Sequence, residues 1–161
     1  MRTKQQTLSV AAEQSLESYR KPTRRDVFLA TMEAIVPWAA PCEANKPNYP
    51  KVGDGRPPIG LERMLRIHFI QRWFNLAGLC CEEAFYGSFS LRRFVGIDLG
   101  REPVPDATAM LKFRRLLNDN QLGEALFARV GAVLQSKGFK VNTGTIVDAT
   151  IQLAHPAGWH R

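Results

Sequence analysis

The stretch "LERMLRIHFIQRWFNL", residues 61–76, decides the fold of this 161-residue chain. Apolar residues recur along it at the three- and four-residue spacing of an α-helix. One side carries Leu61, Met64, Leu65, His68, Phe69 and Arg72, and the remaining circumference carries Ile67, Ile70, Trp73 and Phe74. A helix that is apolar on nearly all sides is buried among others. The sequence therefore predicts a central helix over 61–76, with His68, Trp73 and Phe74 in or beside the core.

Helical spacing also precedes this stretch. Thr23 followed by Asp26 resembles a capping box, which predicts that a helix begins there. Its apolar stripe is Phe28, Met32, Ile35 and Val36. Pro37 and Pro41 are expected to end that helix, because proline is excluded from helix interiors. Residues 41–60 are rich in Pro, Gly and Asn and predict a long ordered loop.

Four further helical segments follow the central helix. Residues 82–89 and 91–94 predict two short helices that are broken near Gly87 and Ser88. Asp106 is a suitable N-cap for a helix over 107–118. The inner face of that helix is expected to be Met110, Phe113, Leu116 and Leu117. A last apolar stripe runs from Leu122 to Leu134, and Gly138 is suited to close it.

Only near the end of the chain does the pattern change from helix to strand. Residues 144–153 are rich in β-branched side chains, and we expect 145–151 to be extended. The predicted fold class is therefore mainly α: a multi-helix domain followed by a single strand.

Composition narrows the classes of function. The net charge is +7, with a pI of about 9.7, which favours an anionic partner such as nucleic acid. No apolar run reaches the ~18 residues of a membrane span, and residues 1–10 do not resemble a secretory signal. The cysteines, Cys42, Cys80 and Cys81, have neither the spacing of a zinc site nor that of a disulfide framework. We expect a cytoplasmic protein.

Basic residues on the later helices are the candidates for DNA contacts. Lys112, Arg114 and Arg115 lie outside the apolar stripe of the 107–118 helix, and Arg92 and Arg93 end the helix before it. Two helices joined by a turn, with basic residues on the second, are typical of a DNA-reading unit. The same pattern also fits an ordinary solvated helix face. The adjacent pair Cys80 and Cys81 is interpreted as small buried residues.

Asp148 is the one residue that indicates catalytic chemistry. It lies in the middle of the strand "TIVDATI", where alternation places it on one face with Ile146 and Thr150. An ionised carboxylate among apolar residues needs a cation or hydrogen bonds to offset its desolvation. Carboxylate-held Mg²⁺ pairs are the usual device for in-line phosphoryl transfer. An aspartate on an exposed strand face fits the same residues.

Taken together, these segments resemble the insertion-sequence-five family (InsH-like) of bacterial transposases. The resemblance runs from about residue 20 to residue 151, in the family's order and spacing. It rests on "RRDVFLATMEAIVPW" (24–38), "YPKVGDGRPPIGLERMLRIHFIQRWFNL" (49–76), "EEAFYGSFSLRRFVGIDL" (82–99), "PDATAMLKFRRLL" (105–117) and "GTIVDATI" (144–151). The five segments together are specific to this family, although no single segment is.

The resemblance implies a DDE transposase that binds the terminal inverted repeats of its element. Such enzymes hold Mg²⁺ with two aspartates and a glutamate on an RNase H-like core. By resemblance, Asp148 is the first of the three acids and a metal ligand. The helical part then corresponds to the family's DNA-binding region, with Arg92, Arg93, Lys112, Arg114 and Arg115 as its candidate contacts.

The chain departs from the family after Ile151. The residues that follow, "QLAHPAGWHR", contain neither a second aspartate nor the glutamate. We therefore expect a basic tail over 1–23, a helical transposase domain over 24–140, and the first strand of a truncated core over 144–161. The family is an enzyme family, but we expect this chain to bind no Mg²⁺ stably and not to cut DNA by itself.

Two functions follow from the sequence. The first is a transposase N-terminal portion that binds inverted-repeat DNA, in the cytoplasm and associated with the nucleoid. The second is a non-catalytic interaction protein that pairs with itself or with full-length transposase and regulates it. The first predicts salt-dependent DNA binding, whereas the second predicts a protein partner and weak affinity for DNA.

Overall fold

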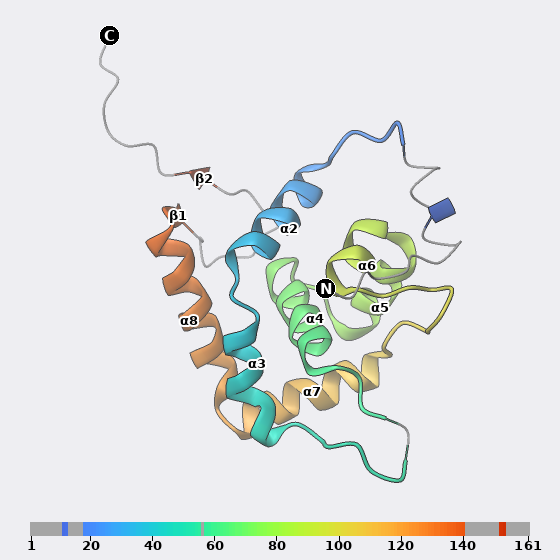
Figure 1. The fold of residues 1–161 in the computed structure, drawn as a ribbon, viewed down its shortest axis with the longest axis vertical. Helices are drawn as coiled ribbons and strands as arrows, with labels where there is room; N and C mark the ends of the chain where they lie inside the picture. The colour runs from blue at the N-terminus through green and yellow to red at the C-terminus, as the bar shows by residue number, and fades with distance from the viewer. Residues whose placement is uncertain (1–10, 13–17, 56, 141–151, 154–161) are drawn as a thin grey trace.

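A computed structural model describes residues 11–12, 18–55, 57–140 and 152–153, and this part of the chain is mainly α-helical (Figure 1). The helices are α2 (Arg24–Ile35), α3 (Ala39–Asn45), the short 3₁₀ helix η1 (Lys46–Asn48), α4 (Leu61–Trp73), α5 (Gly78–Gly87), α6 (Phe89–Val95), α7 (Ala107–Asp119) and α8 (Leu122–Ser136). Two short strands, β1 (Phe139–Lys140) and β2 (Gln152–Leu153), pair antiparallel. The mainly α class is confirmed. The predicted extended run 145–151 lies outside the described residues.

Helix α4 occupies the middle of the fold, as the sequence predicts (Figure 1). It packs against α3, α6 and α7, and Leu65, Phe69 and Ile70 are fully buried. Phe69 connects α4 to α8 and to the start of α3, because its ring centroid lies 4.6 Å from that of Phe127 and 5.7 Å from that of Trp38. The helix ends at Trp73, three residues earlier than predicted.

The start of α2 follows the capping prediction. The Asp26 backbone N–H donates to the Thr23 hydroxyl oxygen, and the Asp26 carboxylate accepts from the Thr23 backbone N–H at 2.7 Å. The helix ends at Ile35, two residues before Pro37. That ending agrees with the restriction that proline imposes on the residue before it.

The loop prediction for 41–60 is partly wrong. Helix α3 covers Ala39–Asn45 and η1 extends it to Asn48. Pro41 occupies the first turn of α3, where its missing N–H has no intrahelical partner to lose. Proline therefore marks the beginning of a helix here, and the irregular connection is confined to 49–60.

Helix α5 begins at Gly78, four residues earlier than predicted. Gly78 faces the start of α7: a Cβ at this position would lie 3.2 Å from the Cβ of Ala107. The glycine thus permits close approach of the two helices rather than breaking one of them. Ser88 caps the start of α6, because its hydroxyl accepts from the Leu91 N–H, and Gly96, with φ of 77°, caps its end.

Helices α7 and α8 contact each other at the end of the domain, and Figure 1 shows them crossing at a wide angle. Asp106 caps α7 as predicted, accepting the Ala109 N–H at 2.6 Å. The connection turns at Gln121, which has φ of 54°. From α8, Leu126, Val130 and Leu134 complete the core. In the described part of the chain, no helix combines the length and the apolar character that crossing a membrane requires.

Candidate nucleic-acid interface

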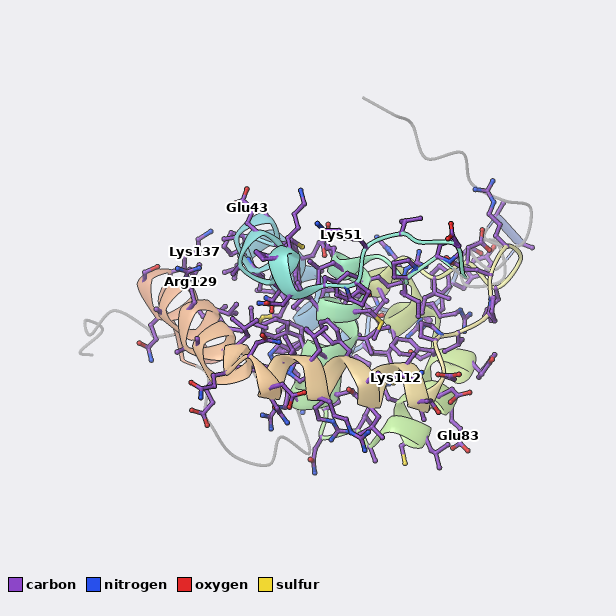
Figure 2. The ribbon with its side chains drawn as sticks, turned by 90° about the horizontal axis from the view of Figure 1, so that it is seen from below. Glu43, Lys51, Glu83, Lys112, Arg129 and Lys137 are labelled. Carbon is purple, nitrogen blue, oxygen red and sulfur yellow. The ribbon has the colours of Figure 1, made fainter. Side chains whose placement is uncertain are left out.

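Helix α7 presents three exposed cations, Lys112, Arg114 and Arg115 (Lys112 is labelled in Figure 2). None of the three forms an ion pair with another described residue. The opposite side of the helix is buried, and its buried residues are Met110, Phe113 and Leu117. These cations are therefore available to an anion in solution.

The three cations do not share one face of α7. Lys112 and Arg114 are two positions apart, which is about 200° around an α-helix. Lys112 lines an apolar groove of about 650 Å³ between the 49–59 connection and the 102–106 connection. Arg114 leaves the helix on a different side from Lys112, and its positive charge helps to lower the pKa of His68 on α4. A ligand that binds one side of α7 therefore cannot contact Lys112 and Arg114 to the same extent.

His68 is buried, with 5% of its surface exposed, and its Nε2 has no hydrogen-bond partner within the described residues. Its ring lies 5.6 Å from Phe127 and 6.2 Å from Phe113, centroid to centroid. Burial, together with the positive charges of Arg72 and Arg114, lowers the pKa of His68 to about 4. The expectation of a core histidine is confirmed, and His68 is neutral at pH 7.

Arg92 is buried, which removes it from the candidate contacts. Only 6% of its surface is exposed, and its Nη1 donates to the carbonyls of Phe85 at 2.7 Å and Tyr86 at 2.9 Å. These carbonyls belong to the last turn of α5, where no intrahelical N–H reaches them. Arg92 thus joins α6 to the end of α5, and its guanidinium does not face solvent.

Arg93, its neighbour in sequence, is exposed and lies elsewhere on the surface. It lines a hollow of about 250 Å³ between α6 and the chain that leads into α2, together with Arg20 and Lys21. Asp26 is at the centre of this region: it pairs with Arg20 at 3.2 Å and accepts from Ser90 of α6. These hydrogen bonds lower the pKa of Asp26 against the opposing effect of burial.

The helix-turn-helix interpretation is wrong in its simple form. Helices α6 and α7 are separated by residues 96–106, whereas the motif has a turn of three or four residues. Helix α5 contacts both of them, and Figure 1 shows α6 and α7 on different sides of α5. Arg93 and the α7 cations therefore do not belong to one compact reading unit.

A buried arginine on α4, Arg66, was not singled out from the sequence. Its side chain is 10% exposed and pairs with Glu33 of α2 and with Glu62 one turn earlier on α4. Its Nη1 also donates to the Phe94 carbonyl of α6 at 2.9 Å, and its Cζ lies 4.4 Å from the ring centroid of Trp38. Arg66 thus joins three helices and the start of α3.

The spacing of Glu62 and Arg66, four residues apart, was the available sign of an ion pair on α4. The contribution of Glu33 comes from a distant part of the chain, so spacing alone does not reveal it. Because both carboxylates and a carbonyl already bind this guanidinium, Arg66 holds the fold together and is not available to a ligand.

The two adjacent cysteines differ in exposure. Cys81 is buried as expected, but Cys80 is exposed, so the pair is not buried as a unit. Burial raises the pKa of Cys81 to about 12, which keeps it a thiol. In the described ranges, no three His, Cys, Asp or Glu side chains gather as metal ligands. Asp148 lies outside those ranges.

The described part of the chain is thus a mainly α domain that exposes a basic helix, α7. Residues 16–116 match the family model described as "Transposase domain (DUF772)". The match covers more than half of the chain and includes α2 to α6 and most of α7, so the chain belongs to this transposase-domain family. No solved structure matches the chain.

Proposed function

We propose that this chain binds the terminal inverted repeats of an insertion sequence, as the DNA-binding portion of an insertion-sequence-five (InsH-like) transposase. The observation that carries the proposal is the set of exposed, unpaired cations on α7, Lys112, Arg114 and Arg115, within a transposase-domain family match. Arginine and lysine side chains on one helix suit phosphate oxygens, which lie at regular intervals along duplex DNA. Such a protein would be associated with the nucleoid.

The placement of the cations ranks them as contacts. Arg114 and Arg115 are adjacent on the solvent side of α7, so we propose that they make the main phosphate contacts. Lys112 borders the apolar groove about 200° around α7 from Arg114, so we rank it below the two arginines. Arg93 lies in a separate hollow and would contact DNA only where the duplex extends past α5. Arg92 is left out because its side chain is buried.

Catalytic chemistry is proposed only for Asp148, and only from the resemblance. As the first acid of a DDE site, it would give Mg²⁺ one carboxylate ligand in the complete family enzyme. The described helices do not supply further clustered ligands. We therefore propose no cleavage step for the helical domain, whose role is to bind and position DNA.

The test is a titration of the purified chain against a duplex that carries the element's terminal repeat, at several salt concentrations. Arg114→Ala with Arg115→Ala should weaken binding and lower the salt slope by about 0.9 for each phosphate that is no longer neutralised. The charge-matched control is Lys46→Ala with Lys51→Ala. Both lysines are exposed, and Lys51 lies on the 49–60 connection, away from α7 in Figure 2.

A scrambled duplex of the same length measures how much of the affinity depends on sequence. If the wild-type chain has no salt-dependent affinity for either duplex, DNA binding is overturned. In that case gel filtration with purified full-length transposase tests the alternative, a non-catalytic protein that pairs with a transposase. If the two arginine substitutions change neither affinity nor slope, α7 is only a solvated helix.

A further inference from the structure

Arg72 on α4 and Arg114 on α7 both place positive charge near the buried His68, whose pKa they help to lower. Both arginines are exposed. The Arg72 Cζ lies 5.5 Å from the Phe127 ring centroid, and the Phe127 ring stands 5.6 Å from that of His68. The His68 ring in turn meets Phe113, the residue before Arg114, at 6.2 Å. One guanidinium thus lies over a ring of this aromatic cluster, and Arg114 directly follows another member of the cluster, Phe113, in the chain.

These two positive charges have no counterion within the described residues. Some other arginines of the same fold do have one: Arg63 pairs with Glu102 at 2.5 Å, and Arg101 pairs with Asp98 at 3.9 Å. Like charges that gather without an acidic partner repel one another, and a bound anion removes that repulsion. The arrangement favours an anionic ligand over a purely structural role.

The ring beneath Arg72 supports the same conclusion. A guanidinium that lies over an aromatic face loses little further freedom when it binds a ligand, because its plane is already oriented. Arg72 is in the last turn of α4, where a cation also complements the helix dipole. Arg114 is in the middle of α7 and has no such role there, so the dipole does not explain the pair.

We propose that Arg72 and Arg114 together bind a phosphodiester of the DNA backbone, so that the DNA-binding surface spans α4 and α7. The inference rests on the proposed function and extends it to a residue outside the basic helix. The ligand chemistry is phosphate, and duplex DNA is its source. Arg115, next to Arg114, would contact an adjacent phosphate on the same strand.

Arg72→Gln is the decisive variant, because glutamine keeps the first two methylene groups and a polar end while removing the charge. We expect weaker binding to duplex DNA and a salt slope lower by about 0.9, as for Arg114→Gln. The matched control is Arg129→Gln on α8. Arg129 is exposed and lies two positions from Phe127, about 200° around the helix, so it faces away from the pair.

A second measurement uses the wild-type chain and does not depend on any variant. His68 is buried beside the pair, so its ¹³C and ¹H resonances should shift on DNA addition without direct contact. We expect no matching shift with inorganic phosphate at equal ionic strength. An unchanged His68 signal in saturated complex overturns the inference, and so does saturation by inorganic phosphate that DNA cannot displace.

The outcomes separate this inference from the proposed function. If Arg72→Gln binds DNA like the wild-type chain while the Arg114 and Arg115 substitutions weaken it, the α4 contact is wrong and DNA binding by α7 stands. If the wild-type chain binds no duplex at all, both fail. Circular dichroism of each variant confirms that the helical fold is retained before binding is compared.

Discussion

The Glu82 carboxylate of α5 accepts a hydrogen bond from the backbone N–H of Ala107, the first residue of α7, at 2.8 Å. The N-terminal N–H groups of a helix have no intrahelical partner, and a carboxylate there also complements the helix dipole. Glu82 therefore fixes the start of the basic helix against α5, next to the close contact between Gly78 and Ala107.

Glu82→Ala should destabilise the domain by about 1.5–3 kcal/mol, the range for a hydrogen bond to a charged group. The measurement is the free energy of unfolding from urea titration, monitored by circular dichroism. Glu83→Ala is the control, since Glu83 is exposed on the same helix (Figure 2) and should change stability by no more than about 0.5 kcal/mol. Equal losses for the two variants would contradict the role given to Glu82.

Arg66 should be the most sensitive charged residue of the domain. Arg66→Ala removes a buried guanidinium that joins Glu33, Glu62 and the Phe94 carbonyl, and we expect a loss of about 3–5 kcal/mol in unfolding free energy. Glu33→Gln should cost much less, about 1 kcal/mol or below, because Glu33 is half exposed. If Arg66→Ala costs no more than Glu33→Gln, the cluster is a surface ion pair.

Helices were predictable where local chemistry determines them. The Thr23–Asp26 capping box and the Asp106 cap lie within one turn of the helices that they start, and both are present. Helix α3 was missed because Pro41 was interpreted as a terminator, although a first-turn proline is compatible with a helix. The early start of α5 was missed because Gly78 is favoured by a contact with α7.

The candidate site was less predictable, because exposure depends on distant partners. Arg92 and Arg93 are neighbours in sequence, yet Arg92 is buried against carbonyls of α5 while Arg93 is exposed. A seven-residue helix gives too short a pattern to separate them. Arg72 was placed on an apolar face of α4, and its position over Phe127 of α8 comes only from the packing of these two helices.

We predict that the 161-residue chain does not nick DNA with Mg²⁺ or Mn²⁺. Asp148 offers one carboxylate, and the residues after Ile151 contain no Asp or Glu. Two-metal phosphoryl transfer needs several fixed oxygen ligands. The assay uses a linear duplex with the element's end, with Asp148→Ala in parallel. Specific nicking that Asp148→Ala abolishes would show that a complete site forms, for instance in an oligomer.

His68 predicts a pH dependence of stability. Burial first, and then the charges of Arg72 on its own helix and Arg114 on α7, lower its pKa to about 4 in the folded chain, against about 6.5 when unfolded. Between these values the unfolded chain binds the extra proton. The stabilisation is therefore complete above pH 6.5 and declines as the pH falls toward 4, by about 3 kcal/mol in all.

His68→Phe should remove most of that decline. Phenylalanine does not titrate and suits the neighbouring rings of Phe113 and Phe127, and it eliminates a buried Nε2 that has no hydrogen-bond partner among the described residues. At pH 7 the variant should therefore be about as stable as the wild-type chain, or more so. Urea unfolding at pH 7, 6, 5 and 4.5 measures both curves. Replacing His155 and His160 together measures the contribution of the other two histidines of the chain. Parallel curves for wild type and His68→Phe would mean that other groups, such as the paired carboxylates, determine the acid sensitivity.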